Sequence, residues 1–183
     1  PNIVVIMDEC FSDPTVLGDF SCNEDFMPYI RSLLDGAPNT ISGHLYVSVL
    51  GGNTANSEFE YLTGDSMAFL PSGSIPYQQY LNKYALSIVS HMEELGYNTT
   101  AMHPYNASGW NRSSVYEKMG FGQFLSLKNY HHGEQLRKYV SDQADFEEVL
   151  DVLNQSTDPA FIFNVTMQNH SSYGTPYDNF TPS

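Results

Sequence analysis

Short apolar runs rich in β-branched residues alternate along the chain with amphipathic stretches. Such runs are typical of strands buried on both faces of a parallel sheet. The segments predicted to be strands are 3–7, 44–50, 98–104 and 160–167. Apolar residues recur at helical spacing elsewhere, and the segments predicted to be helices are 26–36, 54–64, 84–97, 113–120 and 141–155. This alternation predicts an α/β fold with a mainly parallel central sheet.

A glycine turn joins a predicted strand to a predicted helix within SVLGGNTANSEFEYLTG, residues 48–64. Gly51 and Gly52 allow the backbone to turn sharply and to approach a ligand closely. Asn53 and Thr54 are both residue types that favour helix N-termini. Thr54 is therefore predicted to stand at a helix N-terminus, where free N–H groups and the helix dipole attract anions. A purely capping role for Thr54 is the alternative.

Polar side chains follow the predicted strands at their carboxyl ends. The residues in these positions are Asp8 and Glu9, Asn53 and Thr54, His103, and Asn169 and His170. In open parallel sheets, ligands bind beyond the carboxyl ends of the strands. The four positions together therefore predict a functional site at that edge.

Glu9 and Thr54 are the candidates for metal binding and nucleophilic chemistry. A carboxylate directly after a buried strand needs a cation, a hydrogen-bond network or solvent, and its oxygens suit Mn²⁺, Mg²⁺ or Zn²⁺. A threonine hydroxyl is a weak nucleophile unless a metal ion lowers its pKa. The two side chains are therefore predicted to share one ion, and a solvated acid at Glu9 is the alternative.

The segment HPYNASGWNR, residues 103–112, supplies a histidine, a tryptophan and an arginine. Arg112 could grip phosphate oxygens, while Trp110 could form the wall beside a glycerol or sugar group. Core packing of Trp110 and an ion pair of Arg112 with an acid are the alternatives. His170 could donate a proton to a leaving alkoxide or bind a phosphate oxygen.

Composition narrows the possible partners. The 183 residues suit a single domain over 1–183, and the net charge of −14 argues against a nucleic-acid partner. An acidic chain that handles phosphate esters needs a metal ion or a local cationic cluster. Cys10 and Cys22 could form a disulfide or remain thiols. The abrupt beginning on a strand, and an end without an element-closing pattern, predict a part of a longer protein.

Four motifs in order carry a resemblance to a known family: IVVIMDECFSD, GGNTANSEFEYLTG, HPYNASGWNR and MQNHSSY. The chain resembles the extracellular domain of lipoteichoic acid synthases and related phosphoglycerol transferases, in the alkaline phosphatase and sulfatase superfamily. The resemblance covers nearly the whole chain. It implies an alkaline-phosphatase-like αβα sandwich that is truncated at its C-terminus.

The resemblance also implies residue roles. Glu9 matches a metal ligand, and Thr54 matches the metal-binding nucleophile that becomes phosphoglycerol-threonine. The positions that match the glycerol-phosphate pocket are His103, Trp110, Arg112 and His170. Manganese is the implied metal, with magnesium or zinc as alternatives. The implied donor is a phosphatidylglycerol-type lipid, and the acceptor is a cell-envelope glycopolymer. A preceding transmembrane region would anchor the domain at the extracytoplasmic face of a bacterial membrane.

Departures from the family keep other functions open. The family completes its metal site with a later Asp-His pair, which this chain lacks, so residues 1–183 alone are expected to be inactive. A sulfatase would need C/S-x-P-x-R where this chain has NTANSE. A phosphoethanolamine transferase or a phosphodiesterase remains an alternative within the fold. A non-catalytic module that binds glycerol phosphate is an alternative of another class.

Overall fold

The computed structural model describes residues 1–19 and 21–180, which divide into two compact units. The smaller unit is Ser12–Val47, and the larger unit consists of Pro1–Phe11 and the chain from Ser48 onward. The smaller unit holds the 3₁₀ helix η1 (Pro14–Leu17) and the helix α1 (Pro28–Leu34). A single domain over 1–183 stays a prediction.

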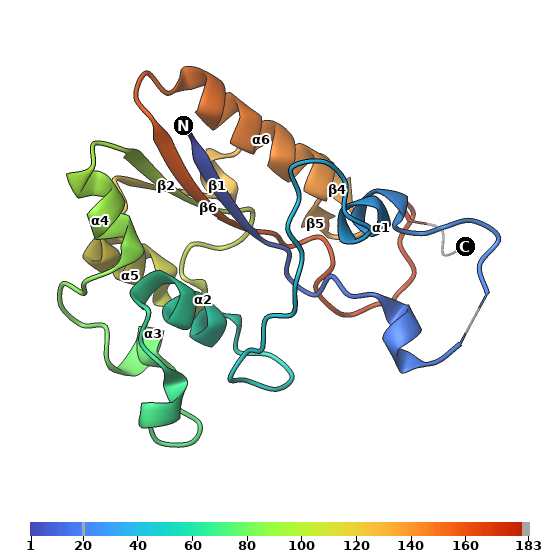
Figure 1. The fold of residues 1–183 in the computed structure, drawn as a ribbon, viewed down its shortest axis with the longest axis horizontal. Helices are drawn as coiled ribbons and strands as arrows, with labels where there is room; N and C mark the ends of the chain where they lie inside the picture. Colours follow the sequence, from blue (N-terminus) through green and yellow to red (C-terminus); the bar gives the residue numbers. More distant parts are fainter. Residues whose placement is uncertain (20, 181–183) are drawn as a thin grey trace. The chain divides into compact units, whose positions relative to one another are not determined.

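The larger unit is built on a sheet of four parallel strands (Figure 1). In spatial order these are β1 (Ile3–Met7), β6 (Ala160–Val165), β2 (Asn98–His103) and β3 (Gln123–Ser126). The predictions of strands at 3–7, 98–104 and 160–167 are confirmed. Every residue of β6 is buried, because a neighbouring strand lies on each side and both faces of the sheet are covered.

Helices cover both faces of this sheet and make three layers. The side chains of β6 alternate between two apolar clusters, with Phe161 and Phe163 in one cluster and Ala160 and Ile162 in the other. The first cluster also holds residues of α2 (Thr54–Thr63), α4 (Ile88–Glu94) and α5 (Arg112–Met119). The second cluster includes residues of α6 (Asp142–Gln155). The predicted αβα arrangement is therefore confirmed in the described part of the chain.

Short elements complete the larger unit. They are η2 (Met67–Phe69), α3 (Pro76–Gln79), η3 (Gly109–Asn111), η4 (Leu127–Asn129) and the antiparallel pair β4 (Gln135–Leu136) and β5 (Tyr139–Val140). Ser141 caps α6 by accepting a hydrogen bond from the Ala144 N–H at 3.1 Å, as its sequence predicts. No helix among the described residues is long and apolar enough to cross a bilayer.

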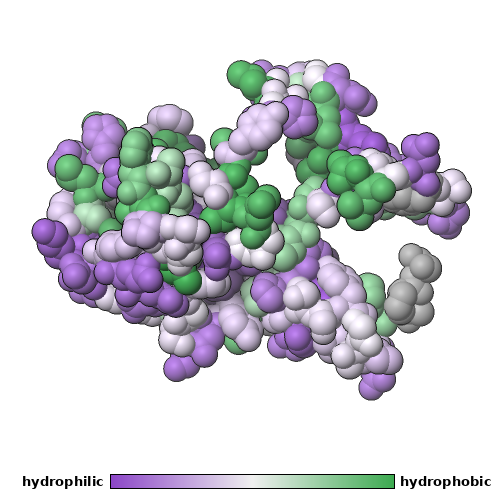
Figure 2. Space-filling view, turned by 90° about the horizontal axis from the view of Figure 1, so that it is seen from below, coloured by the Kyte–Doolittle hydropathy of each residue, from purple (hydrophilic) through white to green (hydrophobic). Residues whose placement is uncertain are grey.

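The strand predicted at 44–50 is wrong. These residues form no strand, and the side chains of Leu45 and Leu50 are 87% and 98% exposed. Apolar surface is visible in several places in Figure 2, and the most exposed apolar side chains of the described residues include Leu17, Ile41, Leu45, Leu50 and Phe69. The pattern of 44–50 has strand character, but no neighbouring strand in the described chain pairs with it. Cys10 and Cys22 are both free and exposed.

Candidate active site

A left-handed turn places Thr54 at the first position of α2. The backbone φ angles of Gly51, Gly52 and Asn53 are 64°, 126° and 56°, values that glycine and asparagine tolerate better than other residues. Asn53, not Thr54, is the N-cap residue, and its side chain makes no capping hydrogen bond. The hydroxyl of Thr54 is therefore available for another partner, which argues against a purely capping role.

That partner is Glu9, at the carboxyl end of β1. Thr54 Oγ1 donates a hydrogen bond to Glu9 Oε1 at 2.7 Å, and both side chains are half-buried. The position of Glu9 is fixed from the end of β6, because its backbone N–H donates to Thr166 Oγ1 at 3.0 Å. The Thr166 hydroxyl in turn donates to Asp8 Oδ1 at 3.1 Å. The structure thus brings together the two residues predicted to share an ion.

The Glu9–Thr54 pair has the donor chemistry of a partial site for a hard cation. A carboxylate oxygen and a hydroxyl oxygen in direct contact suit Mn²⁺ or Mg²⁺. Within residues 1–19 and 21–180, Glu9 belongs to no group of three closely placed His, Cys, Asp or Glu ligand atoms. The chemistry of the two oxygens fits such an ion, and metal binding by Glu9 and Thr54 stays a prediction.

His103 lies at the carboxyl end of β2 with only 2% of its surface exposed. Its Nδ1 is 2.8 Å from the Val165 carbonyl oxygen, so Nδ1 carries the proton and donates. Burial lowers the pKa of His103 to about 4, and the positive charges of Arg112 and His170 add to this effect. His103 is therefore neutral at pH 7, and Nε2 is left as a hydrogen-bond acceptor.

Arg112 is held in an ion pair, as the alternative for this residue expected, but its partner is the buried Glu58 and not a surface acid. Its Nη2 is 2.5 Å from Glu58 Oε1, and its Nε also donates to Glu58. Tyr116 Oη donates to Glu58 Oε2 at 2.6 Å. Burial opposes ionisation of Glu58, but Arg112 and Tyr116 outweigh it and hold the pKa of Glu58 below its usual value. A glutamate one turn after Thr54 on an otherwise buried helix face is the sequence signal for this pair.

The ion pair limits what Arg112 can offer a ligand. Nε and Nη2 both donate to Glu58, whereas Nη1 makes no hydrogen bond within the described part of the chain. The arginine is 2% exposed. A phosphate-gripping role for Arg112 stays a prediction, and in this conformation it would use Nη1.

Trp110 and His170 are the remaining predicted pocket residues. Trp110 has a positive φ of 54° in the turn that begins α5, and its half-buried ring packs against the first apolar cluster. The ring of His170 packs edge-on against Tyr139 at a centroid distance of 5.8 Å. Core packing is thus part of the role of Trp110, and glycerol-phosphate binding by either residue stays a prediction.

Carboxylates also gather beside the N-terminus of α6. Burial raises the pKa of Asp142 to about 7, and the negative charges of Asp8 and Asp145 contribute. Burial likewise raises the pKa of Asp145 to about 6, although Tyr130 and Asn164 donate hydrogen bonds to it. Asp142 Oδ1 is buried without a hydrogen-bond partner among the described residues. Apart from the helix-capping pattern, nothing in the local sequence indicates this cluster.

The protonated state of Asp142 predicts a specific pH dependence of stability. The pKa of Asp142 is raised in the folded state, to about 7. The protonated side chain therefore stabilises the folded state fully at pH values below its pKa in the unfolded chain, and this stabilisation is lost as pH rises through 7. Between pH 6 and pH 8 the Asp142→Asn variant should therefore lose less unfolding free energy than the wild type. Urea unfolding at each pH measures this difference.

Asp158→Asn is the matched control, because Asp158 is exposed. The control should follow the wild-type pH profile. Equal slopes for the wild type and Asp142→Asn between pH 6 and pH 8 would contradict a raised pKa at Asp142.

The sequence profile of one protein family, described as Sulfatase, matches residues 1–183. The chain belongs to the sulfatase family. This sulfatase-family chain is 39% identical over 173 residues to a "putative cyclic beta-1,2-glucan modification protein" of Rhizobium meliloti (strain 1021). It is 27% identical over 175 residues to "lipoteichoic acid synthase 1" of Bacillus subtilis (strain 168). The alignments cover 94% and 92% of this chain and 26% of each relative.

A solved structure supports the same relationship. The Streptococcus pyogenes phosphoglycerol transferase GacH, in complex with sn-glycerol-1-phosphate, superimposes with a TM-score of 0.80 at 29% identity. The match covers 97% of this chain and 47% of GacH. Likeness to solved members of the alkaline phosphatase superfamily confirms the predicted fold class. The sulfatase-family chain spans about a quarter of the length of the two curated relatives, the glucan modification protein and the lipoteichoic acid synthase.

Proposed function

We propose that this sulfatase-family chain is part of a phosphoglycerol transferase. The enzyme would move glycerol phosphate from a phosphatidylglycerol-type lipid to a glycan of the cell envelope. The observation that carries the proposal is the contact of the Thr54 hydroxyl with Glu9 at the start of α2. The likeness to GacH, whose structure contains sn-glycerol-1-phosphate, and to a lipoteichoic acid synthase supports the transferred group.

Thr54 would act as the nucleophile in two displacements. In the first, the Thr54 hydroxyl loses its proton and Oγ1 forms a bond to phosphorus, while the bond from phosphorus to the diacylglycerol oxygen breaks and that oxygen takes up one proton. In the second, an acceptor hydroxyl loses its proton and attacks the same phosphorus, the bond from phosphorus to Oγ1 breaks, and the Thr54 oxygen takes up one proton. The N-terminus of α2 would stabilise charge on the phosphoryl oxygens.

Glu9 and Thr54 would hold a divalent metal ion, with manganese as the expected ion. When bound, the ion supplies positive charge that stabilises the phosphoryl oxygens and favours the deprotonated hydroxyl. Glu9 accepts the hydrogen bond of Thr54 and so orients Oγ1. Neutral His103 could accept a hydrogen bond from a glycerol hydroxyl through Nε2, which fits its lowered pKa.

The acceptor and the location are proposed by analogy with the relatives. The similarity to a cyclic β-1,2-glucan modification protein favours a glucan acceptor, and the similarity to a lipoteichoic acid synthase favours a glycerol-phosphate polymer. By analogy with the lipoteichoic acid synthase, we propose that the domain acts at the extracytoplasmic face of the membrane, attached through a region outside residues 1–183.

A binding module without catalytic activity is the second candidate. The buried Glu58–Arg112 ion pair favours it, because this pair uses two of the three guanidinium nitrogens that phosphoryl transfer could use. Such a module would still bind glycerol phosphate, so ligand binding alone does not separate the two functions.

Intact-protein mass spectrometry is the deciding test. The protein at its natural full length is incubated with Mn²⁺ and phosphatidylglycerol, and the wild type should gain the mass of one phosphoglycerol group. The Thr54→Val variant should gain none. Absence of the adduct from a wild type that binds both Mn²⁺ and glycerol phosphate would refute the transferase and leave the binding module.

A further inference from the structure

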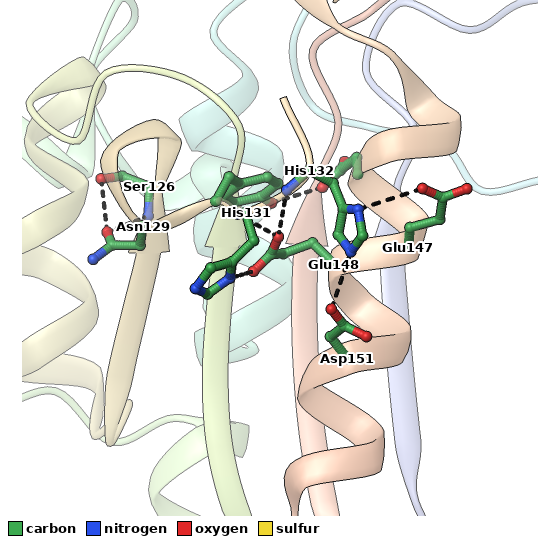
Figure 3. Close-up of polar contacts among 9 residues, drawn as sticks. Ser126, Asn129, His131, His132, Glu147, Glu148 and Asp151 are labelled. Atoms are coloured by element: carbon green, nitrogen blue, oxygen red, sulfur yellow. Dashed lines mark hydrogen bonds and ion pairs between the residues drawn. The ribbon is translucent and has the colours of Figure 1, made fainter. Parts of the chain in front are cut away.

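A second group of metal-ligating side chains lies where the loop before β4 approaches α6. Potential ligand atoms of His132, Glu134 and Glu147 all lie within 4.8 Å of one another. Figure 3 shows His132 directed toward the helix that carries Glu147 and Asp151. None of these residues belongs to the Glu9–Thr54 pair, and the sequence analysis assigned them no function.

A buried carboxylate fixes the loop that carries His132. Glu148 is 2% exposed, and its Oε2 accepts the backbone N–H groups of His131 and His132 at 2.8 and 3.1 Å. Its Oε1 is 2.9 Å from His131 Nδ1. The backbone of His132 is therefore positioned before any ligand arrives, which reduces the entropy lost when a ligand binds.

The ring of His132 stands between two carboxylates. Its Nε2 is 3.0 Å from Asp151 Oδ2, and its Nδ1 is 3.5 Å from Glu147 Oε2. A neutral imidazole carries a single N–H, and the shorter contact places it on Nε2. The lone pair of Nδ1 then faces the Glu147 carboxylate, and either a proton on Nδ1 or a metal ion between the two atoms makes this contact favourable.

The surrounding groups match those found at metal-bound histidines. Such histidines typically donate their other ring N–H to a carboxylate, which fixes the tautomer and strengthens the ligand, and Asp151 occupies this position. Gln143 Nε2 donates to Glu147 Oε1 at 3.0 Å. The other oxygen, Oε2, is thereby kept on the side of His132.

We propose that His132, Glu134 and Glu147 form a binding site for a divalent transition-metal ion of the zinc class. One imidazole nitrogen with two carboxylate oxygens is a ligand set that Zn²⁺ accepts, whereas Mg²⁺ and Ca²⁺ prefer oxygen ligands throughout. Three protein ligands leave room for water in the coordination sphere. The bound ion would join the loop to α6 and stabilise this part of the larger unit.

Calorimetric titration of metal-free protein with Zn²⁺ tests the site. Every protein in this experiment carries Glu9→Gln, which weakens metal binding at the candidate active site, and the protein with this substitution alone is the parent. This parent should bind zinc at His132, Glu134 and Glu147, and His132→Asn should bind it at least about tenfold more weakly. Asp151→Asn should weaken binding by about tenfold or more through the lost ring contact. Zinc should raise the melting temperature of the parent but not that of His132→Asn.

His131→Asn is the matched control, because it removes the neighbouring histidine and keeps the three proposed ligands. The control should bind zinc as the parent does. The proposal would be overturned if the parent bound no zinc, because a proton would then occupy Nδ1. It would also be overturned if the His132→Asn variant bound zinc as tightly as the parent. A third contrary result would be Ca²⁺ or Mg²⁺ binding that is as tight as zinc binding.

Discussion

Glycerol-phosphate transfer by the Thr54→Val variant is expected to fall by at least about 10³-fold, the scale of losses when a catalytic nucleophile is removed. Valine keeps the branched shape of the side chain but removes the oxygen that contacts Glu9. Thr54→Ser keeps the hydroxyl and should retain a measurable fraction of kcat. Release of diacylglycerol from phosphatidylglycerol, measured with the full-length protein and Mn²⁺, gives kcat and KM for each variant.

Thr63→Val supplies the control for the same substitution at the other end of α2. The Thr63 hydroxyl donates to the Phe59 carbonyl oxygen within the helix, so this variant should transfer glycerol phosphate at close to the wild-type rate. A Thr54→Val variant that keeps more than about a tenth of the activity would exclude Thr54 as the nucleophile.

Replacing Glu58 by glutamine is expected to lower the free energy of unfolding by about 3–5 kcal/mol, the usual result of breaking a buried ion pair from one side. The Arg112 charge would remain buried without its counterion, since the two side chains are 3% and 0% exposed. Tyr116 would also lose its charged acceptor. Urea unfolding monitored by circular dichroism measures the change.

A double-mutant cycle separates the ion pair from general damage. Glu58→Gln combined with Arg112→Met should lose less stability than the sum of the two single variants, because the unpaired charge is gone. Glu117→Gln on the exposed side of α5 should change stability by no more than about 0.5 kcal/mol. A Glu58→Gln variant within about 1 kcal/mol of the wild type would mean that the ion pair contributes little.

The strands of the sheet could be predicted because their residues match the environment that they occupy. The run at 160–165 is apolar except for Asn164, and the structure buries all of it between two strands and two helix layers. Residues 44–50 have similar local character, yet they form no strand. A segment forms a strand only if a neighbouring strand pairs with it, in addition to having a local preference for strand structure. A single sequence does not show which neighbouring strand is present.

Some features of the candidate active site could also be predicted from the sequence, and others could not. The contact of Thr54 with Glu9 was predictable in part, because Glu9 follows β1 and a glycine turn places Thr54 at the start of a helix. The strand expected before that turn does not form. The role of Glu58 was not predictable, because a glutamate in a helix is usually exposed and its partner Arg112 lies far along the chain. The raised pKa of Asp142 depends on burial beside other carboxylates, which no local pattern reports.

The place of β6 in the sheet sets the order in which this protein can fold. Strands β1 and β2 both pair with β6 and not with each other (Figure 1), although β6 is the last of the four in sequence. During synthesis, the apolar segment 3–7 therefore meets its partner among the described strands only after residues 160–165 have been made. Such non-local pairing slows folding and leaves strands open to aggregation. The yield of native protein should thus depend on how well the first strand is protected while the chain is still growing.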